Sequence, residues 1–124
     1  MINNDNKSYH RLLLWQKFIA LLKFTYRLTD KLPRSEEFGL KSQMKRAVVS
    51  VISNFVEGYM KKSIKEKLHF IEISETSLLE LEAQSEICMI LGFWTKEDYK
   101  LFDKVRSEAG FFLYRYTQSI NKHS

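Results

Sequence analysis

The feature that most constrains the fold of this chain is the scarcity of residues that interrupt helices. Its 124 residues include only four glycines and one proline, so few positions favour a turn. Between those positions, apolar residues recur every three or four residues over long stretches, which is the spacing of one face of an α-helix. Neither strand alternation nor a repeat of about 20–50 residues is present. The sequence therefore predicts an all-α protein built from a few long helices.

The chain divides into four expected helices, whose bounds are about 9–31, 37–60, 64–91 and 96–121. The residue before Pro33 resists helical geometry, and this ends the first helix. Ser63, with Glu66 three residues later, has the spacing of a capping box at the start of the third helix. Thr95 and Asp98 have the same spacing at the start of the fourth.

Each expected helix carries one apolar seam for a common core. The seams are Leu14, Trp15, Phe18, Leu21, Leu22, Thr25, Leu28 and Thr29; Leu40, Met44, Val48, Val51, Phe55 and Tyr59; Ile71, Ser74, Leu78, Leu81, Ser85 and Cys88; and Phe102, Val105, Ala109, Phe112, Tyr116 and Ile120. Gly58 is a break or close-packing point, and Gly92 is expected in a left-handed conformation after the third helix. Connections of about five, three and four residues force neighbouring helices to be antiparallel. We therefore expect one domain, residues 1–124, folded as an up-down-up-down four-helix bundle.

Composition points to a folded protein of the cytoplasm. The chain has 44% hydrophobic and 28% charged residues, which is typical of a globular domain and unlike a disordered chain. No apolar run approaches the roughly 18 residues that a membrane helix needs, and residues 1–7 lack the apolar core of a signal peptide. The single cysteine, Cys88, has no internal partner, as expected in a reducing compartment. Residues before Ser8 and after Asn121 are expected to fray.

Charge is unevenly distributed along the chain, whose net charge is +5. Residues 1–63 contain 12 Lys and Arg against 5 Asp and Glu, whereas residues 64–91 contain 2 against 6. One interpretation is an electrostatic footprint for nucleic acid. The other is internal neutralisation, in which the basic segments pack near the acidic one.

Lysines gather around the expected turn between the second and third helices. The cluster comprises Lys61, Lys62, Lys65 and Lys67, with further cations at Arg34, Lys41, Lys45 and Arg46. Free N–H groups at the start of the third helix also favour an anion. The predicted nucleic-acid contacts are Lys41, Lys45, Lys61, Lys62 and Lys65, and the aromatic residues expected to be available for stacking on bases are Tyr59, Phe93, Trp94, Tyr99 and Tyr114. The alternative is that a lysine-rich turn only keeps the protein in solution.

A second stripe runs along the second helix, opposite its apolar seam. It contains small and polar residues at helical spacing, namely Gln43, Arg46, Ser50, Ser53, Asn54 and Glu57. Exposed faces usually carry longer Lys and Glu side chains, whereas small residues let another helix approach closely. We interpret the stripe as an interface, either within the bundle or between subunits; the alternative is an ordinary exposed face.

Acidic residues border the seam of the third helix. Glu75 and Glu82 lie at its edge, and Glu72 and Glu86 flank them. A carboxylate that loses water needs a partner, and the expected partners are Lys45 and Arg46. An acid/base catalytic pair is not favoured, because no nucleophile or base cluster accompanies these carboxylates.

Metal and cofactor motifs are incomplete. Glu66 and His69 form one Glu-x-x-His pair, whereas a di-iron bundle needs two such pairs and two further carboxylates. His10 and His123 belong to no such motif. No Cys/His spacing indicates zinc, and no glycine-rich phosphate loop is present. The sequence therefore predicts no metal, no cofactor and no enzymatic activity.

Several segments, in their order and spacing, resemble four-helix-bundle proteins encoded in intervening sequences of bacterial 23S ribosomal RNA genes. They are Leu14-Trp15-Gln16-Lys17, Phe38-Gly39-Leu40, the run from Gln43 to Ser50, the run from Ser53 to Gly58, Lys62-Ser63, Glu80-Leu81-Glu82 and Leu91-Gly92-Phe93. The resemblance extends from Leu14 to Ile120. One departure is Ile52, where the family usually has a proline that kinks the helix, so a straighter second helix is expected here.

The resemblance implies an architecture but no activity, since none is established for the family. It implies a ring-shaped homopentamer, in which the polar stripe of the second helix and the acidic strip of the third form subunit contacts. The fold is also similar to the accessory variability protein of diversity-generating retroelements, which binds a reverse transcriptase and nucleic acid. The leading hypothesis is a non-enzymatic oligomeric bundle associated with RNA or an RNA–protein complex. The alternative is a protein-binding scaffold or accessory subunit without nucleic-acid contact.

Overall fold

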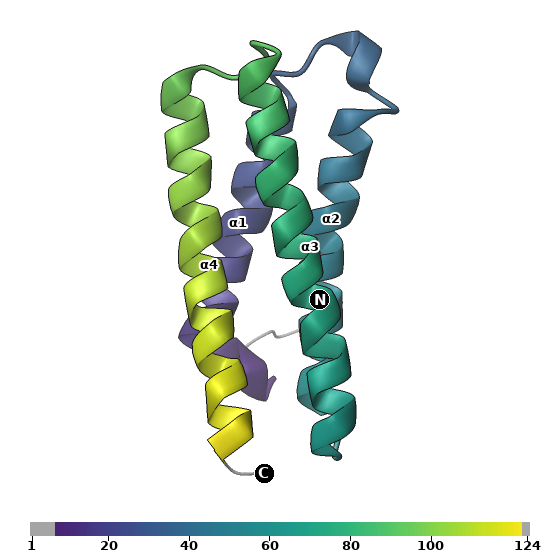
Figure 1. The fold of residues 1–124 in the computed structure, drawn as a ribbon, viewed down its shortest axis with the longest axis vertical. Coiled ribbons are helices and arrows are strands. Elements are labelled where there is room, and N and C mark those ends of the chain that lie inside the picture. Colours follow the sequence, from purple (N-terminus) through teal and green to yellow (C-terminus); the bar gives the residue numbers. More distant parts are fainter. Residues whose placement is uncertain (1–6, 123–124) are drawn as a thin grey trace.

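Four long helices make up the computed structural model, which describes residues 7–122. In chain order the elements are the 3-10 turn η2 (Ser8–Arg11), α1 (Leu13–Thr29), the 3-10 turn η3 (Arg34–Glu36), α2 (Leu40–Met60), α3 (Ile64–Ile90) and α4 (Lys96–Lys122). Each helix packs against two neighbours, in the cyclic order α1, α2, α3, α4, and neighbours run antiparallel (Figure 1). No strand occurs within residues 7–122. The predicted all-α four-helix fold is confirmed.

The starts of the first two helices differ from the prediction. Leu12 is extended, with φ −73° and ψ 137°, and it separates η2 from α1, so α1 does not begin near residue 9. Helix α2 begins at Leu40 and not at residue 37, because η3 and Gly39 intervene. The Glu36 carboxylate then accepts a hydrogen bond from the Leu40 N–H at 3.0 Å. The first connection, residues 30–39, is therefore longer than expected. The predicted fraying falls largely outside the described residues, as does His123.

The boundaries of α3 and α4 follow their capping signals. The Ser63 hydroxyl accepts the Glu66 N–H at 3.0 Å. The Thr95 hydroxyl accepts the Asp98 N–H at 3.0 Å, and the Asp98 carboxylate accepts the Thr95 N–H at 3.4 Å. Gly92 has a φ of 76° in the left-handed region, which costs glycine little. These observations confirm the predicted caps.

The core lies along the bundle axis and contains most of the predicted seams. All six seam residues of α3 are buried, and Phe18, Met44 and Phe55 are inaccessible to solvent. In α4 the seam is displaced, because Leu113 is fully buried while Phe112 is only partly so. The face of α4 that packs against the core therefore includes Leu113 and is slightly rotated from the predicted seam.

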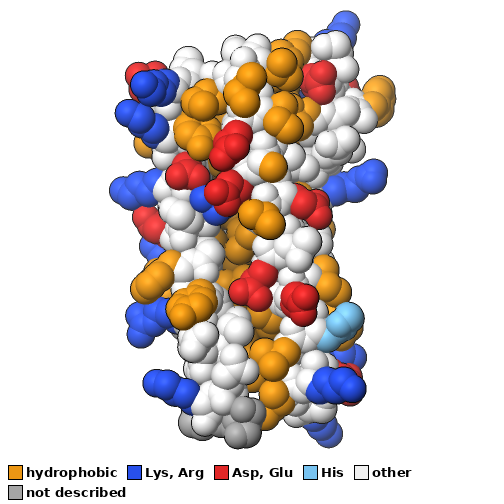
Figure 2. All heavy atoms as spheres, in the orientation of Figure 1, with side chains coloured by type: hydrophobic (Ala, Val, Ile, Leu, Met, Phe, Trp, Pro, Cys, Tyr) orange, Lys and Arg blue, Asp and Glu red, His pale blue; other side chains and the backbone are white. Residues whose placement is uncertain are grey.

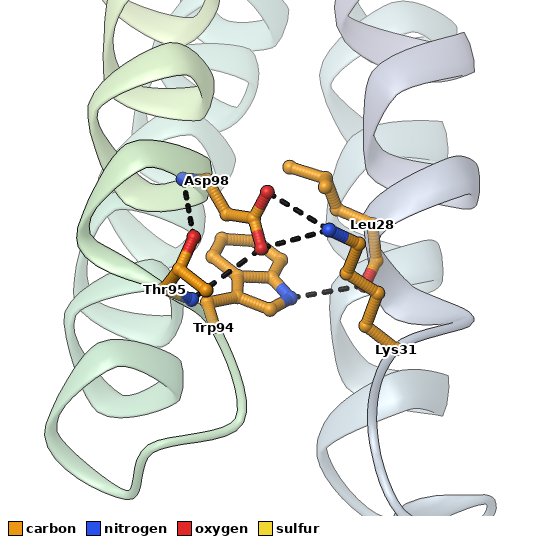
Figure 3. A network of polar contacts seen from close by, with 5 residues as sticks. All are labelled: Leu28, Lys31, Trp94, Thr95 and Asp98. Carbon is orange, nitrogen blue, oxygen red and sulfur yellow. Dashed lines mark hydrogen bonds and ion pairs between the residues drawn. The ribbon is translucent and has the colours of Figure 1, made fainter.

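The turn between α3 and α4 is fastened to the end of α1 (Figure 3). The Trp94 indole N–H donates to the Leu28 carbonyl at 2.9 Å, and the Lys31 ammonium contacts the Asp98 carboxylate at 2.9 Å. Trp94 is 3% exposed, so the expectation that it stacks on bases is wrong. Its ring fills the end of the core, and its N–H satisfies a carbonyl at the C-terminus of α1.

Helices α2 and α3 approach each other closely near their connection. A Cβ atom built on Gly58 would lie 3.0 Å from the Lys67 carbonyl oxygen and 3.1 Å from the Phe70 Cβ. Gly58 is therefore a close-packing site, one of its two predicted roles, and α2 continues past it to Met60. The helix also runs unbroken through Ile52, as expected without proline at that position.

Candidate nucleic-acid and subunit interfaces

The polar stripe of α2 lies partly against the bundle and partly in solvent. Ser50 and Asn54 are partly buried against the bundle, whereas Gln43, Arg46, Ser53 and Glu57 are exposed. The Ser50 and Ser77 hydroxyls lie 2.7 Å apart across α2 and α3, and the Asn54 amide donates to the Ser50 carbonyl at 3.0 Å. Part of the stripe is thus a contact within the bundle, one of the two predicted alternatives.

The exposed part of the stripe lies between two open grooves. The α2–α3 groove has a volume of about 410 Å³ and is lined by Gln43, Arg46, Ala47, Ser50, Ile73, Thr76, Ser77, Glu80 and Gln84. The α1–α2 groove has a volume of about 380 Å³ and is lined by Tyr26, Lys45, Arg46, Val49, Ser50 and Ser53. Arg46 borders both, and it forms no ion pair within residues 7–122. Small-molecule sites usually enclose most of their ligand, so these open grooves suit a macromolecular surface better.

Within the chain, Glu82 has a partner other than the predicted Lys45 and Arg46. Glu82 lies 3.6 Å from Arg106 on α4, and Arg106 also contacts Asp103 at 2.7 Å. Sequence reasoning missed Arg106, although it follows the core residue Phe102 by four positions and so lies at the edge of the α4 seam. Glu82 therefore turns toward α4 and away from the polar stripe of α2.

Glu75 has no ion pair within the described part of the chain. Burial raises the pKa of its carboxyl above the usual range, and the charge of Glu72 adds to the effect. Lys45, one of its expected partners, instead lies with its ammonium 4.7 Å from the centre of the Tyr26 ring. Glu75 is nonetheless exposed at the surface of the chain, so its carboxylate loses only part of its hydration.

Three of the predicted nucleic-acid contacts gather at the α2–α3 turn. Lys62 and Lys65 are exposed, and neither forms an ion pair within residues 7–122. The Lys61 ammonium lies 3.8 Å from Glu57 and 4.0 Å from Glu66, at the limit of an ion pair. Within the described residues, the charges of Lys62 and Lys65 are therefore not balanced by a carboxylate, and that of Lys61 is balanced only weakly.

The other two predicted contacts lie elsewhere. Lys41, at the opposite end of α2, contacts Glu37 at 3.3 Å and Asp30 at 3.4 Å. The hydrogen bond that the Lys41 ammonium donates to the Glu37 carboxylate is the main cause that raises the pKa of Lys41. Lys45 lies one turn further along α2, in the α1–α2 groove. Because a helix of this length spans about 30 Å, the five lysines do not form one patch.

The fold adds cations to the α2–α3 turn that sequence reasoning did not include. In an antiparallel bundle the start of the first helix and the end of the fourth lie at the same end as this turn, as Figure 1 shows. Exposed Arg11 on η2 and exposed Lys122 in the last turn of α4 therefore belong to it. We call Arg11, Lys61, Lys62, Lys65 and Lys122 the basic end. Only the topology of the bundle could have predicted this grouping.

The predicted stacking residues are dispersed. Tyr59 packs within an aromatic cluster, with its ring centre 5.8 Å from that of Phe55 and 6.0 Å from that of Tyr116. Phe93 and Tyr99 are partly buried at the other end of the bundle, and only Tyr114 is largely exposed. Tyr59, the predicted stacking residue next to the α2–α3 turn, is engaged in this cluster, so the lysines of the turn are better suited to phosphates than to bases.

The remaining sequence motifs are readily placed. Glu66 lies in the first turn of α3, and the exposed His69 packs edge-on against Phe70 at 5.1 Å. Within residues 7–122, no three His, Cys, Asp or Glu side chains are grouped as metal ligands. Among the same residues, no helix combines the length and apolar character required to span a bilayer.

Comparison with known proteins identifies the class of this bundle. The search of solved structures finds a similar fold in a protein of unknown function from the S23 ribosomal protein family of Bacteroides thetaiotaomicron, with a TM-score of 0.77 and 19% identity over 85% of this chain and 98% of the other. At that identity the likeness shows the fold alone. No curated protein gives a significant match. The sequence profile of the 23S rRNA-intervening sequence protein family matches residues 10–115, and this chain belongs to that family.

Proposed function

We propose that this protein is a non-enzymatic, cytoplasmic bundle that assembles as a ring-shaped homopentamer and associates with RNA through its basic end. The observation that carries the proposal is the collection of cations from η2, the α2–α3 turn and α4 at one end of the bundle. Lys62 and Lys65 have no carboxylate partner within residues 7–122, so binding a phosphate would not require breaking an existing ion pair there.

The start of α3 adds a second attraction for phosphate at the same end. The first N–H groups of a helix have no partner within the helix and favour anions. Here the Ser63 hydroxyl already accepts the N–H of Glu66, so the N–H groups of Ile64 and Lys65 are the ones left for an anion. Contacts of this kind address the nucleic-acid backbone, so the proposed binding is largely independent of sequence.

Assembly would multiply a modest charge. One chain offers only a few cations at the basic end, whereas a ring of five would present them in a continuous collar. The exposed half of the α2 stripe and its two grooves support such an assembly, because Arg46 and Lys45 have no ion pairs within the described residues. The family name of this chain refers to ribosomal RNA genes, which makes RNA the first nucleic acid to test.

Charge reversal at the α2–α3 turn tests the proposal. The variant Lys61→Glu/Lys62→Glu/Lys65→Glu should lose nearly all binding to a labelled RNA hairpin at about 50 mM salt, where electrostatic binding is strong. The measurement is fluorescence anisotropy. The helix should persist, because a glutamate in the first turn of α3 is favourable to the helix dipole.

A matched control is available on α4. The variant Lys96→Glu/Lys100→Glu/Lys104→Glu changes the net charge equally at exposed positions on another face, and it should retain most of the affinity. Equal losses in the two variants would show that only net charge matters. Absence of binding by the unaltered protein would remove the RNA proposal, and a protein-binding scaffold would then be the better account.

That second candidate has its own support. Helix α3 exposes several large apolar side chains, among them Leu79, Ile87 and Ile90, and contiguous exposed apolar surface marks protein contacts. A scaffold or accessory subunit would use this surface without touching nucleic acid.

A further inference from the structure

The C-terminal half of helix α3 has apolar residues on two opposite sides, separated by glutamates. One side forms the core seam, and the other carries Leu79, Ala83, Ile87 and Ile90, which we call the α3 outer face. Leu79, Ile87 and Ile90 are 64%, 43% and 75% exposed. A cluster of large exposed apolar side chains marks a contact surface. The outer face is therefore a surface that lacks its partner in the single chain.

The α3 outer face is also acidic. Residues 72–91 contain five glutamates and no Lys or Arg. Glu80 and Glu86 lie beside the apolar side chains and form no ion pair within residues 7–122. Figure 2 shows orange side chains gathered over the upper half of α3 with red ones among them, while blue side chains lie mainly at the margins and the lower end. The missing partner must be apolar and basic.

The α1–α2 groove has that complementary character. Tyr26 and Val49 expose 41% and 47% of their surface in it, and Lys45 and Arg46 form its basic border. Neither cation has an ion pair within the described residues. The groove combines apolar and basic side chains, whereas the α3 outer face combines apolar and acidic ones.

The two surfaces match in length and lie on different sides of the bundle. Along α2, Lys45, Val49 and Ser53 span about 12 Å, and Leu79 to Ile90 spans about 16 Å along α3. Ser53 is small enough to let a helix lie close.

Arg46 and Glu80 both line the α2–α3 groove of one chain but form no ion pair there. The rest of the α1–α2 groove, with Tyr26, lies on the side of α2 that faces α1 and away from α3, so only another copy can bring it to Leu79, Ile87 and Ile90.

We propose that the α1–α2 groove of a second copy of this chain covers the α3 outer face. Leu79, Ile87 and Ile90 pack against Tyr26 and Val49 of that copy, and Glu80 and Glu86 approach its Lys45 and Arg46. The contact joins two different surfaces, so it is heterologous and repeats from copy to copy as a ring or a filament. The inference rests on the proposed assembly and names the surfaces that make it.

Two variants, each blocked on one surface, test the contact. Ile87→Lys/Ile90→Lys blocks the α3 outer face, and Arg46→Glu/Val49→Glu blocks the groove. Light scattering should find each variant at the mass of one chain, where the unaltered protein has a multiple of it. An equimolar mixture should form a dimer of twice the chain mass, since each variant retains the surface that the other needs.

Controls separate this inference from the proposed function. Phe111→Lys, at a side chain 55% exposed on α4, should leave the mass of the assembly unchanged. Circular dichroism of each blocked variant should match that of the unaltered protein; if Ile87→Lys/Ile90→Lys loses helix, Ile87→Ser/Ile90→Ser replaces it with the same expected fall in mass.

The outcomes are distinct. The contact proposed here is wrong if the blocked variants have the same mass as the assembled, unaltered protein. It is also wrong if they become single chains that do not combine with each other. In both cases the proposed assembly itself stands. If the unaltered protein is a single chain, assembly itself is wrong. A different, basic protein that binds the α3 outer face of that single chain would identify another occupant and would also overturn the inference.

Discussion

Small side chains control how closely α2 and α3 pack. Ser74 donates to the Val51 carbonyl at 2.6 Å, the Ser50 and Ser77 hydroxyls meet at 2.7 Å, and Gly58 lies against the backbone of α3. Hydroxyls here satisfy backbone groups and one another inside a buried contact. Ser50 belongs to the polar stripe of α2, and its side chain is small because a larger one would separate the two helices.

Gly58 should be intolerant of a methyl group, although alanine is the better helix former. Gly58→Ala gains roughly 1 kcal/mol of helix propensity, but its Cβ would lie 3.0 Å from the Lys67 carbonyl, a backbone atom that moves only with α3. We expect a net loss of about 1–3 kcal/mol in the free energy of unfolding. Urea denaturation followed by circular dichroism measures it.

Gly110 is the matched control, because a Cβ there would meet nothing within 4 Å. Gly110→Ala should raise the free energy of unfolding by about 0.5–1 kcal/mol. If both alanine variants were stabilising, the close approach of α2 and α3 at Gly58 would be wrong.

Two carboxylates should affect the pH dependence of stability in opposite directions. The hydrogen bond from Lys31 is the main cause that lowers the pKa of Asp98 below its ordinary value of 3.8. The ionised Asp98 carboxylate therefore adds to the free energy of unfolding at neutral pH, and this contribution is lost as the pH falls through the lowered pKa. Burial raises the pKa of Glu75 above its ordinary value of 4.5, so its ionised form is destabilising at neutral pH.

Melting temperatures of two variants check these signs. Asp98→Asn should melt below the unaltered protein at neutral pH, and the difference should shrink as the pH falls below 3.8 and through the lowered pKa of the Asp98 carboxyl. Glu75→Gln should melt at or above the unaltered protein at neutral pH, with the difference vanishing in acid. A Glu75→Gln variant that is less stable at neutral pH would indicate a cation partner for Glu75 in the assembled protein.

At the scale of elements, the predictability of each helix depended on its local signals. Helices α3 and α4 begin at side-chain caps, and α3 is followed by a glycine at positive φ, all of which can be read from residue type and spacing. Helices α1 and α2 have no side-chain cap at their N-cap residues. Their starts are set by Leu12 and by η3, and periodicity extends smoothly across both, so the predicted helices began too early.

The candidate surfaces were less predictable than the helices. Lys61, Lys62 and Lys65 are adjacent in sequence, and their grouping needed no fold. Arg11 and Lys122 join them only through the antiparallel arrangement. The pairing of Glu82 with Arg106 depends on which flank of α3 faces α4, and a helical projection does not determine the neighbour on each side. The α3 outer face was also missed, because only one apolar seam was assigned to this helix and the apolar residues opposite it were not considered.

At the scale of the whole molecule, charge is separated along and around the bundle. The basic end gathers cations from three elements, and the α3 outer face carries acidic residues without basic ones. An isolated chain would leave both surfaces without complementary charge. Assembly through the acidic face and RNA binding through the basic end therefore use different parts of the molecule and are compatible with each other.

The salt dependence of RNA binding tests the central claim, a collar formed by the basic ends of several subunits. Each phosphate contact on a duplex contributes about −0.9 to the slope of log K against log salt concentration. The five cations of one basic end would give a slope of about −4.5 at most. For an RNA hairpin we predict a slope steeper than about −5, which requires the basic ends of at least two subunits. A slope of about −4.5 or shallower, for a protein shown to be assembled, would contradict the collar.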